Sequence, residues 1–252
     1  MFLNRRELLL ASVGLALPYQ EPPTLWLIGD STVKNNTKGQ QGWGTALPAL
    51  VDATKLKVVN KALGGRSSRT FLTEGLWDAV AKELKKGDIV VMQFGHNDGG
   101  DKFKGTRPRA SIKGNGEETE TGTVEATGKE ETVHSYGWYL RKYITDAKAK
   151  GATVVVCSPV PRNIWKDGKV GRASGDYGKW AKEAAAQEKV LFLDLNSLIA
   201  DRYDILGEEK VVALFFGDHT HTSPEGAALS AGIIAEGLKK LTLLPGVALR
   251  NF

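Results

Sequence analysis

Short runs of apolar residues alternate with longer amphipathic stretches along this chain of 252 residues. Five runs are rich in apolar, mostly β-branched residues, at 25–28, 58–63, 88–94, 153–158 and 190–195. Such runs are typical of strands that are buried on both faces of a parallel sheet. Helical patterns lie between or after them, at 45–53, 72–86, 136–150, 177–188 and 223–241. The alternation predicts a three-layer α/β/α sandwich with a five-stranded parallel sheet.

The segment 101–133 does not follow this alternation. It is polar, it is rich in glycine, threonine and charge, and it has no apolar periodicity. Basic residues dominate its first part and acidic residues its second. Long segments of this kind are usually functional or disordered. We therefore predict a long polar loop at 101–133, on the face that carries the active site.

The first twenty residues have the pattern of an export signal. Arg5 and Arg6 precede an apolar run at 8–17, and Pro18 follows. The run is too short to span a bilayer, and the arginine pair followed by leucines resembles a twin-arginine signal. We predict that residues 1–20 direct export to the periplasm or the cell exterior, by this or the general signal route, without stable membrane insertion after processing. An uncleaved anchor and an amphipathic tail are the alternatives. Residues 21–252 are then expected to form a single domain.

Composition narrows the choice of partners. The net charge is +5, but the basic residues are scattered, which favours an ordinary solvated surface over a nucleic-acid site. No G-x-G-x-x-G follows the first run, and neither G-x-x-x-x-G-K-[ST] nor G-x-S-x-G occurs. These absences disfavour a dinucleotide-binding protein and an α/β-hydrolase. The single cysteine, Cys157, cannot form an intramolecular disulfide.

Unusual polar residues follow three of the predicted strands and precede the last predicted helix. The sequences are GDS at 29–31, ALGGRSS at 62–68, GHND at 95–98 and DHTHTSPEG at 218–226. Ligands of parallel sheets bind at the carboxyl ends of the strands. Each motif alone would be weak, since glycine and small polar residues often only form turns. Four of them on one rim indicate a catalytic site.

These residue types meet the requirements of acyl transfer. A serine needs a base to take its proton, and a histidine base needs a carboxylate to orient it. Ser31 is the candidate nucleophile, His221 the base and Asp218 the carboxylate. The oxyanion needs hydrogen-bond donors. We expect these from the backbone N–H groups of Ser31 and Gly65 and from the side-chain amide of Asn97.

Neighbouring residues admit other interpretations. Asp30 and Asp98 are expected to bond to backbone N–H groups of adjacent turns, as aspartates commonly do. His96, Asp218, His219 and His221 could instead be zinc ligands. The serine mechanism also accounts for Ser31, which a metal site does not. We therefore predict no metal site.

The four motifs, in this order, resemble the GDSL or SGNH hydrolase superfamily. The longer matches GDSTV, NKALGGRSSRTF, QFGHNDGG and DHTHTSPEG resemble its rhamnogalacturonan acetylesterase branch. The resemblance implies a flavodoxin-like fold, no cofactor and removal of acetyl groups from pectic polysaccharide. It also implies the roles given above for Ser31, Gly65, Asn97, Asp218 and His221. Esterases acting on acetylated xylan or lysophospholipids are alternatives within the superfamily.

A polysaccharide-binding protein without catalysis is the alternative from another class. Tryptophans can stack on sugars, and arginines can pair with galacturonate carboxylates. The candidate substrate-binding residues are Trp43, Arg66, Arg69, Arg162 and Trp165. Binding alone does not require a nucleophile, a base and an acid, so the enzyme is the favoured interpretation.

Overall fold

The computed structural model describes residues 21–172 and 175–241, so the predicted export signal at 1–20 lies outside the described residues. A five-stranded sheet has the order β2-β1-β3-β6-β9. The strands are β1 (Thr24–Gly29), β2 (Lys57–Asn60), β3 (Ile89–Gln93), β6 (Thr153–Cys157) and β9 (Leu191–Leu193). Every pairing is parallel. The predicted sheet is confirmed, with each strand inside or within one residue of its predicted run.

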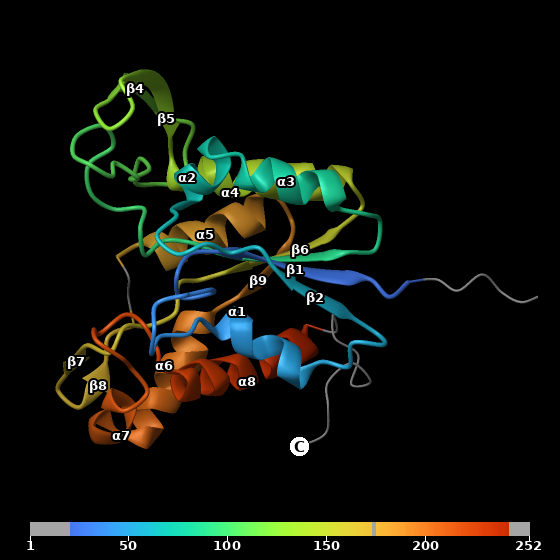
Figure 1. Ribbon diagram of the computed structural model, residues 1–252, viewed down its shortest axis with the longest axis vertical. Helices are drawn as coiled ribbons and strands as arrows, with labels where there is room; N and C mark the ends of the chain where they lie inside the picture. Colours follow the sequence, from blue (N-terminus) through green and yellow to red (C-terminus); the bar gives the residue numbers. More distant parts are fainter. Residues whose placement is uncertain (1–20, 173–174, 242–252) are drawn as a thin grey trace, which may run out of the picture.

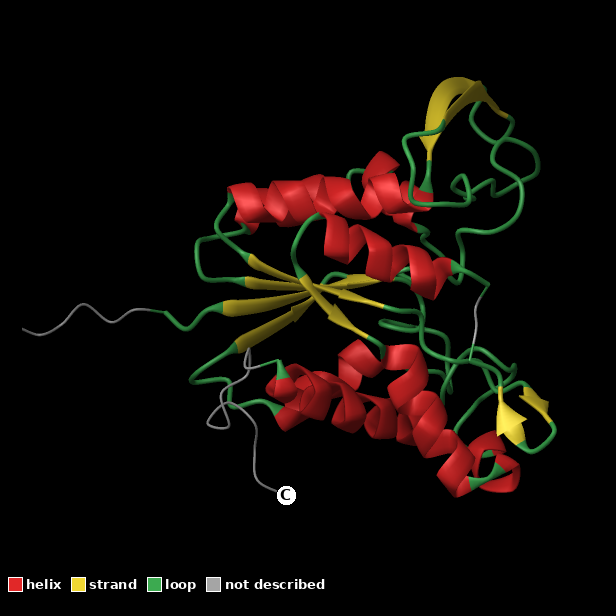
Figure 2. Cartoon of the chain, turned by 180° about the vertical axis from the view of Figure 1, so that it is seen from behind, coloured by secondary structure: helices red, strands yellow, loops and turns green. Residues whose placement is uncertain are grey.

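Helices cover both faces of the sheet, which gives three layers (Figures 1 and 2). One layer contains α2 (Ser68–Thr73), α3 (Leu76–Glu83), α4 (Tyr136–Ala149) and α5 (Tyr177–Gln187). The other contains α1 (Trp43–Ala46), the 3-10 helix η1 (Leu47–Leu50), α6 (Leu195–Leu206), α7 (Glu208–Val212) and α8 (Pro224–Lys240). No described helix is long and apolar enough to cross a membrane.

The side chains of β1 alternate between the two layers. Leu25 and Leu27 join the apolar cluster beneath α1, α6 and α8, while Trp26 and Ile28 join the cluster beneath α2 to α5. Successive side chains of a strand point to opposite faces. An almost continuous apolar run is therefore what a strand needs when both faces are covered.

Two helical predictions need correction. The pattern at 72–86 is not one helix, because Gly75 adopts a left-handed conformation with φ +73° and separates α2 from α3. The pattern at 45–53 gives only α1 and η1, with Pro48 at the start of η1. By contrast, α8 begins as its sequence predicts, with Ser223 accepting a hydrogen bond from the Gly226 N–H and Pro224 in the first turn.

The prediction of a loop throughout 101–133 is wrong for its second half. β4 (Thr119–Val124) and β5 (Lys129–His134) form an antiparallel hairpin, which stands at the top of Figure 1. Threonines alternate along β4, and Gly128, with φ +68°, lies in the turn. Threonine is β-branched and favours strands, but it is polar, so these strands contain no apolar run that would predict them. A second short hairpin joins β7 (Trp165–Lys166) to β8 (Lys169–Val170).

Candidate active site

Ser31 lies on the sharp turn that follows β1. Gly29 ends the strand, and a side chain there would collide with the carbonyl oxygen of Gln93 on β3. The chain then turns back, with the Val33 N–H donating to the Asp30 carbonyl oxygen at 3.1 Å. Glycine is thus required at the last strand position, where the two backbones approach closely. The turn holds Ser31 at the carboxyl edge of the sheet.

The loop before α8 brings His221 and Asp218 to Ser31. Ser31 Oγ lies 2.8 Å from His221 Nε2, and His221 Nδ1 lies 2.7 Å from Asp218 Oδ2. Because a carboxylate can only accept, Nδ1 carries the ring proton and Nε2 is left to accept from the serine hydroxyl. The three side chains form one hydrogen-bonded chain, which is the arrangement that activates a serine nucleophile.

Asp218 is held in its ionised form. Burial alone would raise its pKa, but hydrogen bonds from the His221 side chain and from the backbone of Thr220 and His221, with the charge of His221, lower the pKa to about 2. The two backbone N–H groups donate to Asp218 Oδ1 at 2.7 and 2.8 Å. At neutral pH the carboxylate can therefore stabilise a positive charge on the His221 ring.

A cavity of about 550 Å³ lies beside Ser31 and His221, and Gly65 and Asn97 line it as well. Gly65 has φ +77°, a conformation that favours glycine. Asn97 Nδ2 donates to the Arg66 carbonyl oxygen at 3.0 Å, which uses one of its two amide hydrogens. The structure thus places the expected nucleophile and the expected oxyanion donors around one space.

A larger hollow of about 1180 Å³ lies at the amino end of the sheet, where Thr24, Lys57 and Asp88 line it. Its described lining contains no serine, cysteine or histidine. The reactive groups therefore belong to the smaller cavity.

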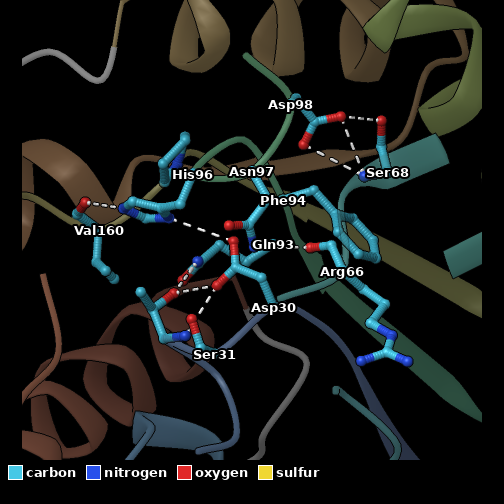
Figure 3. A network of polar contacts seen from close by, with 12 residues as sticks. Asp30, Ser31, Arg66, Ser68, Gln93, Phe94, His96, Asn97, Asp98 and Val160 are labelled. Atoms are coloured by element: carbon cyan, nitrogen blue, oxygen red, sulfur yellow. Dashed lines mark hydrogen bonds and ion pairs between the residues drawn. The ribbon is translucent and has the colours of Figure 1, made fainter. Parts of the chain in front are cut away.

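A second aspartate–histidine pair, Asp30 and His96, lies next to Ser31 (Figure 3). His96 Nδ1 is 3.3 Å from Asp30 Oδ2, and His96 Nε2 is 3.0 Å from the carbonyl oxygen of Val160. The N–H and hydroxyl of Thr32 also donate to Asp30, at 2.8 and 2.7 Å, which confirms the expected turn-bracing role of Asp30. Burial alone would raise the pKa of Asp30, but the charge and hydrogen bond of His96 and the bonds from Thr32 lower it.

Asp98 joins the same edge of the sheet to α2. It accepts hydrogen bonds from the N–H and the hydroxyl of Ser68, the first residue of α2, and from the hydroxyl of Ser111. Its expected bracing role is therefore confirmed. Complete burial raises the pKa of Asp98 to about 6, although the serine hydrogen bonds oppose the shift.

Two of the expected substrate contacts are wrong. Trp43 is buried in the core, and its indole N–H donates to Gln93 Oε1 at 2.8 Å. Arg69 is also buried, with an ion pair to Glu131 at 2.6 Å. Both side chains point into the interior of the protein, so neither can contact a polysaccharide.

The other three expected contacts do not line the cavity. Arg66 extends away from Ser31 (Figure 3) and pairs with Glu74 at 2.8 Å. Trp165 packs against the core and donates to Asn163 Oδ1 at 2.7 Å. The Nε atom of Arg162 is buried without a partner within the described residues. The structure therefore does not bring Arg66, Arg162 or Trp165 to the nucleophile.

Two arginines that were not among the candidates do line the cavity. Arg107 and Arg109 enter it from the polar segment, and Arg109 Nη1 donates to the Gly65 carbonyl oxygen at 3.1 Å. The sequence signal is the tripeptide RPR at 107–109. Nothing in its local pattern links it to Ser31, because the contact depends on how the segment folds across the sheet edge.

Across residues 21–172 and 175–241, no cluster of three or more histidine, cysteine, aspartate or glutamate side chains could hold a metal ion. His96 pairs with Asp30 and His221 with Asp218, so the two histidines do not share a carboxylate.

Comparison with known proteins gives a consistent set of relatives. A profile of the GDSL-like lipase/acylhydrolase family matches residues 27–229. A rhamnogalacturonan acetylesterase of Emericella nidulans is 33% identical over 246 residues, which cover 98% of this chain and 95% of that protein. A protein of Bacillus subtilis named as a probable rhamnogalacturonan acetylesterase, YesY, is 32% identical over 87% of this chain and 94% of its own length.

A solved structure has a similar fold. The crystal structure of the Bacillus subtilis protein YxiM is similar with a TM-score of 0.71 and 29% identity. The similarity covers 88% of this chain and 57% of that one.

Proposed function

This chain belongs to the GDSL-like lipase/acylhydrolase family and is a carboxylic ester hydrolase, and we propose that it removes acetyl groups from rhamnogalacturonan through an acetyl-enzyme intermediate. The observation that carries the mechanism is the 2.8 Å contact between Ser31 Oγ and His221 Nε2, with Asp218 behind the ring. The substrate class is supported by the relatives, of which the Emericella nidulans protein is named a rhamnogalacturonan acetylesterase.

In the first half of the reaction, Ser31 Oγ attacks the acetyl carbonyl carbon while His221 Nε2 accepts the hydroxyl proton. Negative charge develops on the carbonyl oxygen. The N–H groups of Ser31 and Gly65 and the Asn97 amide donate hydrogen bonds to it. When the tetrahedral intermediate collapses, the bond to the sugar oxygen breaks, and that oxygen takes the proton from His221. Asp218, ionised at neutral pH, stabilises the imidazolium between these transfers.

In the second half, a water molecule takes the place of the sugar. His221 accepts a proton from the water as its oxygen attacks the acetyl carbon, and the same donors bind the oxyanion. The proton then passes to Ser31 Oγ and acetate leaves. No group besides the protein and water is needed to balance the reaction.

The decisive experiment measures acetate release from acetylated rhamnogalacturonan, acetylated xylan and 4-nitrophenyl acetate, with a Ser31→Ala protein as control. We expect the highest kcat/KM on rhamnogalacturonan and none of these activities in the variant. Comparable or greater kcat/KM on xylan would overturn the proposed substrate. A Ser31→Ala protein as active as the parent would overturn the proposed nucleophile.

Export is part of the same proposal, because a pectic polysaccharide lies outside the cell. It is supported by the Arg5-Arg6 pair and the apolar run that follows. Fractionation of cells that express the full chain should find the protein outside the cytoplasm. The variant Arg5→Lys/Arg6→Lys should stay in the cytoplasm if the twin-arginine route is used. Equal export of a chain lacking residues 1–20 would contradict the proposal.

A further inference from the structure

Arg107 and Arg109 reach the cavity from the polar segment, one on each side of Pro108. The proline ring fixes its own φ and restricts the residue before it, so Pro108 limits the conformations of the chain between the two arginines. Both arginines line the cavity that also contains Ser31, Asn97 and His221.

Neither guanidinium has an acidic partner. Within residues 21–172 and 175–241, no carboxylate lies within ion-pair distance of Arg107 or Arg109. Four other arginines do have one: Arg66 pairs with Glu74, Arg69 with Glu131, Arg141 with Glu117, and Arg172 with Asp201 and Asp204. Arg162 and Arg202 also have no ion pair within the described residues, but only Arg107 and Arg109 line the cavity of Ser31.

The two charges are also close enough to repel each other. The pKa of Arg109 is lowered first by burial and next by the positive charge of Arg107, while the charges of Asp30 and Asp98 oppose the shift. Two like charges that share one cavity wall, with no carboxylate at ion-pair distance in the described part of the chain, form a site that an anion would stabilise.

Arg107 and Arg109 lie against Gly65, and this position determines how far a bound anion would be from the ester. A Cβ atom on Gly65 would collide with the guanidinium of Arg107, so this group lies directly against the glycine. Arg109 is fixed by its hydrogen bond to the Gly65 carbonyl oxygen. An anion bound here would therefore lie on the wall of the cavity that holds the acetyl ester.

We propose that Arg107 and Arg109 form a subsite for a uronic-acid carboxylate of the polysaccharide, on the acetylated sugar or its neighbour. Guanidinium groups bind carboxylates through paired, charge-assisted hydrogen bonds, which supply both affinity and orientation. The subsite selects an acidic polymer over a neutral one such as xylan. It rests on the proposed function, because it assumes that the ester is carried by a uronate-containing chain.

The test compares acetylated rhamnogalacturonan oligosaccharides with the same material after reduction of the carboxyl groups to alcohols. We expect the parent protein to prefer the acidic form. In Arg107→Gln, and more strongly in Arg107→Gln/Arg109→Gln, the ratio of kcat/KM between the acidic and the reduced form should fall about 10–100-fold, mainly through KM. Arg107→Gln is the cleaner variant, since no hydrogen bond of this guanidinium is found within the described part of the chain.

Lys104→Gln is the matched control. It removes one positive charge from an exposed position of the same segment that does not line the cavity. The ratio should remain that of the parent. If Lys104→Gln lowered the ratio as much as Arg107→Gln, a general surface charge would replace the proposed subsite. An unchanged ratio in the double arginine variant, or equal losses on both substrates, would also overturn the proposal.

A binding measurement separates this proposal from the function on which it rests. Calorimetry with the Ser31→Ala protein and deacetylated oligosaccharides needs no turnover. Weaker binding of the carboxyl-reduced form, and loss of this difference on adding Arg107→Gln, would support the subsite. Equal binding of both forms would overturn it. Failure of the parent protein to release acetate from either form would refute the proposed function instead.

Discussion

Two aspartate–histidine pairs contact the turn that carries Ser31. In the outer pair, Asp218 and His221 have side chains that are 39% and 24% exposed, and their closest contact is 2.7 Å. In the inner pair, Asp30 and His96 are 0% and 3% exposed, and the contact is 3.3 Å. The residue types are the same, but the surroundings differ.

The second ring nitrogen decides what each histidine can do. His221 Nε2 faces the hydroxyl of Ser31, which can give up a proton. His96 Nε2 faces the carbonyl oxygen of Val160, which can only accept, so this nitrogen must keep its proton. The outer histidine is thus free to act as a base, whereas the inner one connects the turn after β1 to the loop after β6. A carboxylate beside a histidine is therefore insufficient evidence of catalysis.

The largest expected effect is a loss of catalytic rate when Ser31 or the histidine of the outer pair is replaced. Ser31→Ala and His221→Ala should each lower kcat/KM on the order of 10⁴–10⁶-fold, because the nucleophile and the base act as one unit. Both side chains lie at an open cavity, so the melting temperature should stay close to that of the parent. Steady-state kinetics and thermal unfolding of the same preparations make the comparison. A variant that unfolds early would show that the outer pair also supports the fold.

The next effect is on stability, from the inner pair. His96→Gln removes the imidazole that contacts the buried carboxylate of Asp30 at 3.3 Å, and removing one partner of a buried pair typically costs about 3–5 kcal/mol. Denaturant unfolding should show the loss. The double variant Asp30→Asn/His96→Gln is the control. It should recover part of the lost free energy of unfolding, because no buried charge is left without a partner. A free energy of unfolding equal to that of the parent in His96→Gln would mean that the inner pair does not stabilise the fold.

Asn97→Ala tests the boundary between the two regions, since Asn97 follows His96 in the chain but lines the cavity. Removing one oxyanion donor typically lowers kcat about 10²–10³-fold. The variant should remain folded, with KM little changed. A kcat equal to that of the parent would remove Asn97 from the oxyanion site and leave its hydrogen bond to Arg66 as its role.

The smallest expected effect is a pH dependence of the free energy of unfolding that arises from the buried carboxylate of Asp98. The pKa of Asp98 is about 6 in the folded protein, against 3.8 as its ordinary value. Between these values the unfolded chain binds fewer protons, so this group makes the free energy of unfolding fall as pH rises from about 4 to 6, by at most ~1.4 kcal/mol per unit. Asp98→Asn should abolish this contribution in denaturant titrations across that range.

Asp218 provides the contrast in the same titrations. Its folded pKa of about 2 lies below the ordinary value, so its contribution is present above pH 4 and is lost only as pH falls towards 2. Asp218→Asn should therefore leave the slope between pH 4 and 6 as in the parent. A change of slope there would mean that the outer carboxylate titrates in this range.

Local sequence was sufficient for much of the fold. The five buried strands and the start of α8 were predicted because two-faced burial requires unbroken apolar runs and because Ser223 and Pro224 form a standard helix start. The β4–β5 hairpin was missed because its strands are polar. Helix α6 was missed because its first residue, Leu195, continues the apolar run of β9 and so hides the boundary.

What the sequence determined by itself is the set of chemical groups and the edge to which each belongs. Ser31 and Asn97 follow strands of a parallel sheet, and parallel strands have all their carboxyl ends on one side, while His221 is marked by the motif just before the last helix. What only the tertiary structure decided is which polar groups face one another across that edge. It made Arg69 a buried ion-pair partner and brought Arg107 and Arg109 to the cavity in its place. The physical reason is that the direction of an arginine side chain depends on the path of its own segment over the sheet, and contacts distant in sequence fix that path.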